Sequence, residues 1–328
     1  MASLPVAVDA MGGDRAPEEI VAGALQAREE DGIEVLLVGD PERIGDTGHI
    51  PVLAASEVIG MDDDPGQGVR TKKDSSLVRA AEAVRDSKAL AMVSAGNTGA
   101  AMASALLRIG RMKGISRPAI ATPIPDLGST PTVLLDSGAN AECSALMLSQ
   151  FARMGAAYSR CRYGVAEPSV ALLSIGEEKS KGTPLVREVH QLLSADASIR
   201  FVGNVEGRDL LRGAADVVVT DGFTGNVALK CLEGSLRFFM DTLLGVLASD
   251  DAAKAASEVL LPKLAPIAAE LDPEGTGGAM LLGIDGVCVI SHGSSSRRAV
   301  ASAIKVAHDL ALNGLVPSLG AALLAGTG

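Results

Sequence analysis

Short apolar runs alternate with helical patterns along almost the entire chain, and this alternation restricts the folds that it can adopt. Strands that alternate with helices are typical of a mostly parallel sheet with helices on both faces. The sequence therefore predicts a three-layer α/β/α architecture and, because no low-complexity linker divides it, a single domain over residues 1–328. The expected strands cover residues 6–8, 35–38, 90–93, 119–124, 132–135, 170–175, 199–202, 216–220 and 287–290, and the expected helices cover residues 17–28, 75–86, 98–109, 144–157, 184–193, 224–271 and 297–312.

Three turns that contain a Gly-Asn pair follow or interrupt these apolar runs, at Gly96-Asn97, Gly203-Asn204 and Gly225-Asn226. In an open parallel sheet, the loops after the strand ends form the ligand crevice. Glycine allows the backbone to approach a ligand closely, and N–H groups at the start of a helix favour an anion. The turns therefore predict a pocket for a small anion, while ordinary tight strand-to-helix turns remain the alternative interpretation.

Composition argues against several classes of protein. The net charge is −11, so there is no basic surplus to neutralise the phosphates of a nucleic acid. No apolar stretch reaches the ~18 residues that span a bilayer, and the first five residues lack the pattern of a secretion signal. The cysteines have no close pair, as expected for reduced thiols in the cytoplasm; they are Cys143, Cys161, Cys231 and Cys288.

Several well-known signatures are missing from the sequence. No Gly-x-Gly-x-x-Gly follows the first strand, and there is neither a Walker-type phosphate loop nor a Gly-x-Ser-x-Gly elbow. The histidines lie too far apart in sequence to suggest a metal site; they are His49, His190, His292 and His308. We therefore expect no metal and no nicotinamide cofactor.

Six stretches resemble, in order along the chain, the bacterial phosphate acyltransferases (the PlsX-type family). These stretches are Val6–Asp14, Lys72–Ser76, Ser94–Ala100, Asn204–Asp209, Asp221–Lys230 and Ser291–Ser294. The resemblance implies a fold similar to phosphotransacetylase and to the isocitrate and isopropylmalate dehydrogenases, without their nicotinamide or metal. It also implies transfer of a fatty acyl group from acyl carrier protein to inorganic phosphate. The acyl phosphate would then supply a glycerol-phosphate acyltransferase at the membrane for phospholipid synthesis.

Two other classes of function remain open at this stage. One is a related enzyme, either a phosphotransacetylase that uses acyl-CoA or a metal-dependent dehydrogenase. The other is a non-catalytic module that binds an anion or the carrier protein. A covalent acyl-enzyme on Cys143 is a rival mechanism, although cysteine on a small-residue helix is usually a buried filler.

For direct attack by phosphate, an enzyme must above all hold the phosphate and the thioester in the right relative position. A general base is less important, because the phosphate oxygens are already ionised. For phosphate and acyl binding we single out polar and glycine positions near strand ends: Ser94, Gly96, Asn97, Thr98, Asn140, Asn204 and Glu206. For catalysis we single out Lys181, Asn226, Lys230, His292 and Asp221. Their ordinary alternatives are turn-forming asparagines, helix caps, surface lysines and a structural histidine.

Partner contacts are predicted at two further places. Acyl carrier protein is acidic, so docking needs a local basic patch; Arg108, Arg111, Lys113 and Arg117 form one at a helix end, where such cations also suit the helix dipole. Residues 236–271 form long apolar helices that we expect to make a homodimer interface or cover the acyl chain. The sharper alternative is peripheral contact with the inner face of the membrane.

Overall fold

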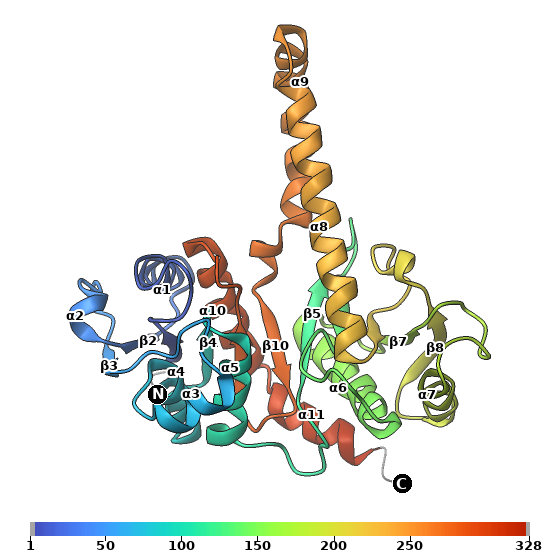
Figure 1. Ribbon diagram of the computed structural model, residues 1–328, viewed down its shortest axis with the longest axis horizontal. Helices are drawn as coiled ribbons and strands as arrows, with labels where there is room; N and C mark the ends of the chain where they lie inside the picture. The colour runs from blue at the N-terminus through green and yellow to red at the C-terminus, as the bar shows by residue number, and fades with distance from the viewer. Residues whose placement is uncertain (1–3, 326–328) are drawn as a thin grey trace.

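A computed structural model describes residues 4–325, in which one 11-stranded sheet runs through the molecule in the order β3-β2-β1-β4-β11-β10-β5-β6-β9-β7-β8 (Figure 1). Seven of its neighbouring strand pairs are parallel and three are antiparallel. The predicted three-layer, mostly parallel architecture is confirmed. The strands are β1 (Val6–Asp9), β2 (Val35–Gly39), β3 (Val52–Ala54), β4 (Ala91–Ser94), β5 (Ala119–Ile124), β6 (Thr132–Leu135), β7 (Ser169–Leu173), β8 (Arg200–Val205), β9 (Val217–Val219), β10 (Ala279–Leu282) and β11 (Val287–Ile290).

The two halves of the sheet run in opposite directions. Strands β1, β4 and β11 are parallel to one another, whereas β10 is antiparallel to both β11 and β5, and β5 is antiparallel to β6. Strands β6, β9, β7 and β8 are again mutually parallel. The carboxyl ends of β1, β4 and β11 therefore lie at one edge of the sheet, and those of β6, β9 and β7 at the opposite edge.

The helices follow these strands in the chain. They are α1 (Glu18–Asp31), α2 (Pro41–Ile44), α3 (Pro65–Thr71), α4 (Ser76–Arg85), α5 (Thr98–Ser104) with its π-helical continuation η1 (Ala105–Ile109), α6 (Ala145–Tyr163), α7 (Pro184–Ala195), the 3-10 turn η2 (Gly207–Asp209), α8 (Gly222–Leu247), α9 (Asp251–Leu271), the 3-10 turn η3 (Pro273–Thr276), α10 (Arg297–Leu312) and α11 (Leu315–Leu324). Side-chain caps at most starts explain their bounds; Ser75 accepts the Val78 N–H at α4, and Thr183 accepts the Val186 N–H at α7.

Side chains alternate between two faces of the sheet, as the strand period requires. On the first face one continuous apolar cluster joins α1, α10, α11, α6 and α7 to the strands. On the second face there are two separate clusters: one under α3, α4 and α5, and one under η2 and the first turns of α8. The second face is therefore divided, and the division falls along β5, whose Ile120 belongs to one cluster and Ile124 to the other.

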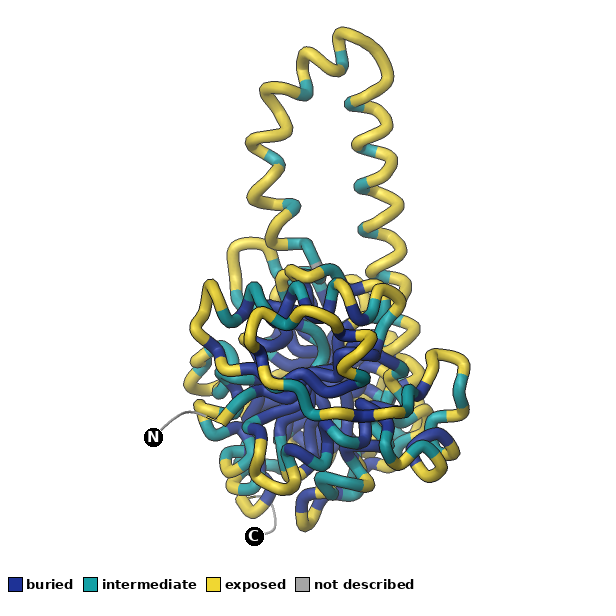
Figure 2. The backbone as a smooth tube through the Cα atoms, turned by 90° about the vertical axis from the view of Figure 1, so that its left-hand side faces the viewer, coloured by how far each residue is buried: buried dark blue, intermediate teal, exposed yellow. Residues whose placement is uncertain are grey.

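Helices α8 and α9 form a long arm that leaves the body of the molecule (Figures 1 and 2). Only Gly222 and Gly225 are buried in α8, and no residue of α9 is buried. The arm nevertheless exposes large apolar side chains, among them Phe238 at 74% and Phe239 at 62%. Such a surface is typical of an interface with another molecule.

Most predicted elements agree with the structure, but several differ, and helices α2 and α3 are among those that were not predicted. The predicted helix over 224–271 is two helices, because the chain turns at Ala248–Asp250. Strands β3 and β10 and helix α11 were not predicted. Among the described residues no single helix is long and apolar enough to cross a membrane; α10 and α11 pass that test only as a pair bent by 56°, and α10 buries one side in the core.

Candidate functional site

A first group of polar residues lies where β1 and β4 end. Ser94 donates its hydroxyl to the buried carboxylate of Asp9 over 2.7 Å and accepts the Gly96 N–H over 3.1 Å. Burial raises the pKa of Asp9, although hydrogen bonds from Ser76 and Ser94 act in the opposite direction. A side chain at Gly12 would overlap the Asp9 carboxylate, so glycine is needed for the close approach of these two turns.

Asn97 caps α5 and fastens the preceding loop to it. Its Oδ1 accepts the Ala100 N–H over 3.0 Å, and its Nδ2 donates to the carbonyls of Met61 (2.8 Å) and Asp63 (3.3 Å). Both ends of the Asn97 amide therefore already have hydrogen-bond partners, in agreement with the helix-cap alternative. An anion at this turn would be contacted by the first N–H groups of α5 and by the exposed Thr98 hydroxyl.

His292 joins this first group from the loop that follows β11. The Ser294 N–H donates to His292 Nδ1 over 3.2 Å, so a neutral imidazole carries its proton on Nε2. The Ser291 N–H donates to the Ser94 carbonyl over 2.9 Å and ties this loop to the end of β4. Arg15, which sequence reasoning missed, donates from its guanidinium to the Ser294 carbonyl and brings a cation to the group. Its position just after the first strand end was the available signal.

A second group lies at the opposite edge, at Asp136, the residue that follows β6. The Asp136 carboxylate is buried and accepts five N–H bonds, from Ile120 (3.0 Å), Gly138 (3.3 Å), Ala139 (3.0 Å) and both the backbone (2.8 Å) and side chain (2.9 Å) of Asn140. The Asn140 side chain also donates to the Pro118 carbonyl over 2.8 Å. Asn140 therefore braces the turn, and its amide is largely used within it.

The first turn of α8 packs directly on this braced turn. The Gly222 N–H donates to the Asn140 carbonyl over 2.8 Å, and a side chain at Gly225 would overlap the Asp136 carbonyl oxygen. Asp221 caps the helix by accepting the Thr224 N–H and hydroxyl, each over 2.8 Å. Asp221 is thus a helix cap, the ordinary alternative to the catalytic role that was predicted from the sequence.

Asn226 and Lys230 share one flank of α8, as their spacing of four residues requires. The exposed Asn226 lies against the turn at Gly138, where an added Cβ would be 3.6 Å from Asn226 Cβ. Lys230 is exposed and pairs with Glu233 over 2.8 Å. The α8 residues that pack on the second face are Ala228, Leu229 and Leu232, and Asn226 and Lys230 are exposed beside them.

The remaining predicted residues lie near the edge strand β8, at the far side of the sheet from β1: Asn204 is in β8, Glu206 follows it, and Lys181 is in the loop between β7 and α7. Asn204 Nδ2 donates to the Glu178 carbonyl over 3.1 Å, and its Oδ1 lies 3.0 Å from His190 Nδ1, so both ends of this amide have internal partners. Glu206 precedes η2 and pairs with Arg208 over 3.3 Å, and Lys181 is exposed. The structure does not bring Lys181, Asn204 and Glu206 together with the first group.

The prediction of a single crevice along one row of strand ends is therefore wrong, because the carboxyl ends of β1 and β4 lie at one edge of the sheet and those of β6 and β9 at the opposite edge. The groups can meet only across the second face. Helix α5 starts at the first group and α8 starts at the second, and both pack on that face. With a rise of 1.5 Å per residue, α8 carries Lys230 roughly 12 Å from Gly222 toward the opposite edge, about the length of a four-residue strand.

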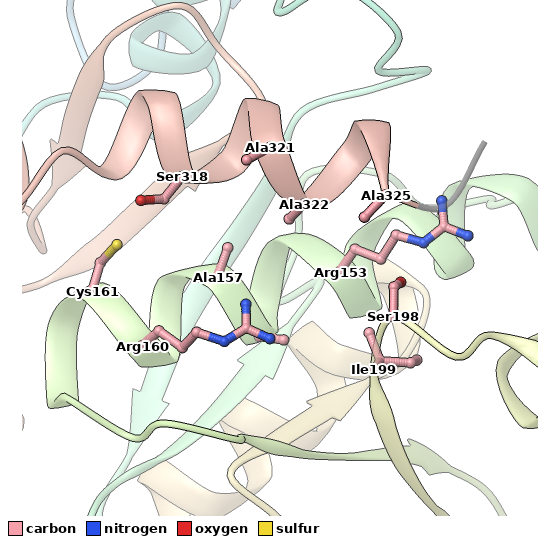
Figure 3. A pocket seen from close by; sticks show the side chains of 11 residues that line it. Arg153, Ala157, Arg160, Cys161, Ser198, Ile199, Ser318, Ala321, Ala322 and Ala325 are labelled. Atoms are coloured by element: carbon pink, nitrogen blue, oxygen red, sulfur yellow. The ribbon is translucent and has the colours of Figure 1, made fainter. Parts of the chain in front are cut away.

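A pocket of about 340 Å³ lies elsewhere, between α6 and α11 (Figure 3). Alanines form much of its wall, and Arg153 at its border is already paired with Asp196 over 2.7 Å. This pocket is on the first face and contains none of the predicted site residues. Within residues 4–325, no cluster of three or more His, Cys, Asp or Glu side chains is arranged to hold a metal ion.

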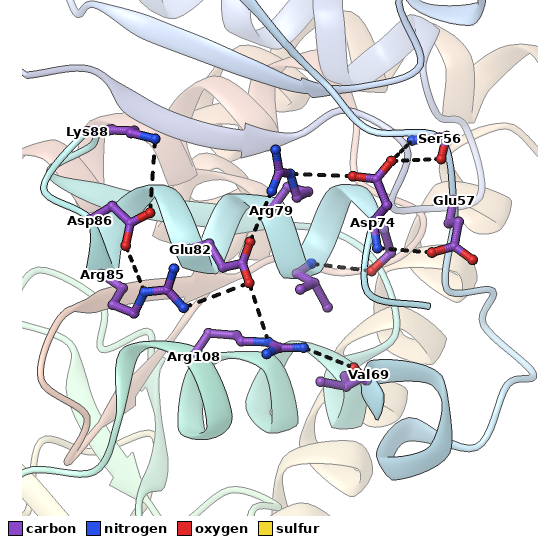
Figure 4. A network of polar contacts seen from close by, with 12 residues as sticks. Ser56, Glu57, Val69, Asp74, Arg79, Glu82, Arg85, Asp86, Lys88 and Arg108 are labelled. Atoms are coloured by element: carbon purple, nitrogen blue, oxygen red, sulfur yellow. Dashed lines mark hydrogen bonds and ion pairs between the residues drawn. The ribbon is translucent and has the colours of Figure 1, made fainter. Parts of the chain in front are cut away.

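The predicted carrier-docking patch is smaller than expected. Arg108 points into a network that joins α4, η1 and α3 (Figure 4): its Nε lies 3.8 Å from Glu82, and its Nη2 lies 3.5 Å from the Val69 carbonyl. Arg111 is exposed and donates to the Ser116 carbonyl over 2.6 Å. Lys113 and Arg117 are exposed as well. Three of the four predicted cations are thus accessible.

Cys143 is poorly suited to act as a nucleophile. Burial raises the pKa of its thiol to about 11, and the nearby carboxylates of Asp136 and Asp221 act in the same direction. Its Sγ lies 3.6 Å from the Asn140 carbonyl oxygen. At neutral pH the side chain is therefore an uncharged thiol, whereas the thiolate is the reactive form.

Comparison with known proteins gives consistent results. A family described as "Fatty acid synthesis protein" matches residues 4–317. A phosphate acyltransferase from Nostoc punctiforme is 46% identical over 312 residues, which cover 93% of this chain and 92% of that protein. A phosphate acyltransferase from Dictyoglomus turgidum is 45% identical over 315 residues, with 94% of each chain covered.

Solved structures with the same fold have much lower sequence identity. The EutD phosphotransacetylase from Staphylococcus aureus superimposes with a TM-score of 0.61 at 16% identity, covering 94% of both chains. A branched-chain phosphotransacylase from Enterococcus faecalis gives 0.61 at 15% identity, covering 94% of this chain and 99% of that one. The predicted likeness to the phosphotransacetylase fold is confirmed. The sequence relatives establish more than the fold: this chain belongs to the bacterial phosphate acyltransferase family, enzymes that transfer acyl groups.

Proposed function

We propose that the chain transfers a fatty acyl group from the thioester of acyl carrier protein to inorganic phosphate, and that the acyl phosphate feeds phospholipid synthesis. The observation that carries the proposal is the family membership, combined with two strand-end groups that flank one divided face of the sheet. Residues 1–328 act as one catalytic domain in this proposal. No covalent intermediate is needed, because phosphate is itself an oxygen nucleophile near neutral pH.

The first group would hold the phosphate. The N–H groups at the start of α5, the Thr98 hydroxyl, His292 and Arg15 together supply donors and positive charge without a metal. The Asp9 carboxylate beside this group is buried and accepts hydrogen bonds from the Ser94 hydroxyl and the Met11 N–H. Fixing phosphate beside a thioester in attack geometry can lower the barrier by ~7–11 kcal/mol.

The α8 flank would stabilise the charge that develops on the thioester carbonyl. Asn226 offers an amide donor and Lys230 a cation, and the packed first turn of α8 fixes their position. Loss of one such donor costs ~3–4 kcal/mol in known enzymes. The thiol that is released has a pKa of ~8.5, so its thiolate can leave without assistance from a strong general acid.

The decisive experiment mixes the purified protein with acyl carrier thioester and inorganic phosphate and traps the product with hydroxylamine. We expect a phosphate-dependent hydroxamate whose yield equals the thiol released. A parallel reaction with acyl-CoA tests the alternative suggested by the phosphotransacetylase fold neighbours. A strong preference for acyl-CoA would replace the proposed donor, and thiol release without hydroxamate would contradict acyl transfer to phosphate.

Carrier docking in this proposal uses the accessible cations Arg111, Lys113 and Arg117. Arg108, which is partly buried and pairs with Glu82, adds positive charge next to them. Local positive charge is required because both proteins are acidic overall. We place the protein in the cytoplasm, with peripheral contact at the inner face of the membrane where a glycerol-phosphate acyltransferase would take the product. This location follows from the lipophilic product.

The arm formed by α8 and α9 would pair with a second copy of the chain. Its tip carries Asp250 and Asp251, whose negative charge disfavours insertion into an anionic membrane. We expect Phe238→Ser with Phe239→Ser to convert a dimer into a monomer, because both side chains are largely exposed in a single chain. Light scattering measures the mass, with Leu107→Ser, an exposed apolar residue outside the arm, as the control. An unchanged dimer that no longer binds lipid vesicles would favour the membrane alternative instead.

A further inference from the structure

Met61 stands at the tip of a tight turn, where methionine is an unusual residue. The turn runs from Gly60 to Asp63 and is closed by the Asp63 N–H, which donates to the Gly60 carbonyl over 3.3 Å. Turns of this kind generally favour glycine, proline and short polar residues. Met61 instead places a large apolar side chain there and leaves 48% of its surface exposed. The chain itself therefore covers only about half of this apolar group.

Three hydrogen bonds hold the turn in place. The Asp63 carboxylate accepts the Gly60 N–H over 2.7 Å and the Lys72 ammonium over 2.5 Å. From the start of α5, Asn97 Nδ2 donates to the Met61 carbonyl over 2.8 Å. None of these bonds uses the side chain of Met61. The position of the turn is therefore independent of the thioether, and the side chain can be replaced without loss of these contacts.

Met61 lies between the two loops that supply the proposed phosphate donors. Its carbonyl is held by Asn97, which directly precedes Thr98. Its side chain reaches the loop after β11, where a Cβ added at Gly293 would be 3.2 Å from Met61 Cε. Gly293 directly follows His292. Because Thr98 and His292 are the side chains proposed to contact phosphate, Met61 borders the phosphate position from both loops.

The reaction requires the acyl chain to begin close to this position. The phosphate oxygen and the thioester carbonyl carbon must approach to ~3–3.5 Å before the new bond forms. The acyl chain starts at that carbon, so its first methylene groups must lie beside the bound phosphate. An apolar side chain that borders the phosphate position is therefore well placed to contact them, and methionine is flexible enough to follow a chain in different conformations.

The charge beside Met61 also favours the acyl chain over a second anion. A Cβ added at Gly293 would be 3.2 Å from both carboxylate oxygens of Asp14, as it is from Met61 Cε. Asp14 is exposed, so its negative charge repels phosphate from this side of the group. An uncharged methylene chain is not repelled, and it gains the apolar contact with Met61.

We propose that Met61 contacts the first methylene groups of the acyl chain and thereby favours long-chain donors over acetyl donors. The inference rests on the proposed function and adds a specificity-determining residue to it. An acetyl group ends at its second carbon and offers little surface for this contact. Removal of the Met61 side chain should therefore slow the reaction of long acyl groups and leave that of acetyl groups almost unchanged.

The test measures Met61→Ala with hexadecanoyl and acetyl thioesters of acyl carrier protein, with a radiolabel on the acyl group so that slow transfer remains measurable. We expect kcat/KM for the hexadecanoyl donor to fall about 10-fold, and that for the acetyl donor by less than about 2-fold. The KM for phosphate should not change. Met61→Leu should retain most of the preference. Leu192→Ala is the matched control, because Leu192 is 44% exposed but lies on α7, which packs on the first face of the sheet.

Three results would overturn the inference and leave the proposed function intact. Equal losses with both donors would place Met61 beside the pantetheine arm that the two donors share. A raised KM for phosphate would mean that the side chain shapes the anion site. An unchanged kcat/KM for the hexadecanoyl donor would mean that no contact is made. If the wild-type protein forms no acyl phosphate from either thioester, the proposed function itself is wrong.

Discussion

Gly225→Ala is expected to abolish acyl phosphate formation and to lower the free energy of unfolding by about 3 kcal/mol. The new methyl group would overlap the Asp136 carbonyl oxygen, and the overlapped atom is backbone, so it cannot move aside as a flexible side chain would. The first turn of α8 would have to lift from the sheet. Asn226 and Lys230 would move with it, because one continuous helix carries them.

Gly234→Ala in the same helix is the matched control. Nothing lies within 4 Å of a Cβ at Gly234, so alanine should stabilise the helix by ~1 kcal/mol. Urea unfolding and the hydroxylamine assay measure both variants. If Gly225→Ala kept its activity and its unfolding free energy, α8 would not be held by its contact with Asp136.

Much of the fold could be predicted from the sequence because buried strands and their caps leave local signals. The runs at 119–124 and 132–135 were predicted with the bounds that the structure gives. The direction of a strand could not be predicted in this way, because an apolar run has the same pattern in a parallel and in an antiparallel strand. Strand β10 shows the consequence: Ala279–Leu282 are four residues that return from the arm, and they pair antiparallel with β11 and β5. The two halves of the sheet point in opposite directions because β6 pairs antiparallel with β5, a reversal that the prediction of all strand ends at one edge did not include.

The candidate site was predictable to a similar extent. Sequence reasoning identified the turns at Gly96-Asn97 and Gly225-Asn226, because glycine and asparagine at strand ends are local features. It could not tell that the Asn97 amide is used up by Met61 and Asp63, since those partners come from a distant loop.

Asp136→Asn is expected to destabilise the protein by about 3 kcal/mol and to lower kcat/KM steeply. The carboxylate accepts three N–H bonds on Oδ1 and two on Oδ2; one comes from Ile120 in β5 and four from the turn on which α8 rests. An asparagine must direct its own NH₂ group at one of these sets of donors. At least two buried N–H groups would then lose their acceptor, and the turn from Gly138 to Asn140 would shift.

Asp221→Asn provides the comparison, because asparagine caps a helix about as well as aspartate. Its unfolding free energy should change by only a few tenths of a kcal/mol, so any loss of activity would report on the chemistry of Asp221 and not on the fold. Asp136→Asn should instead lose stability and activity together. If it lost activity with its urea midpoint unchanged, Asp136 would have to act on the substrate directly, although it is buried in this structure. The pair of variants therefore separates a carboxylate that builds the site from one that takes part in the reaction.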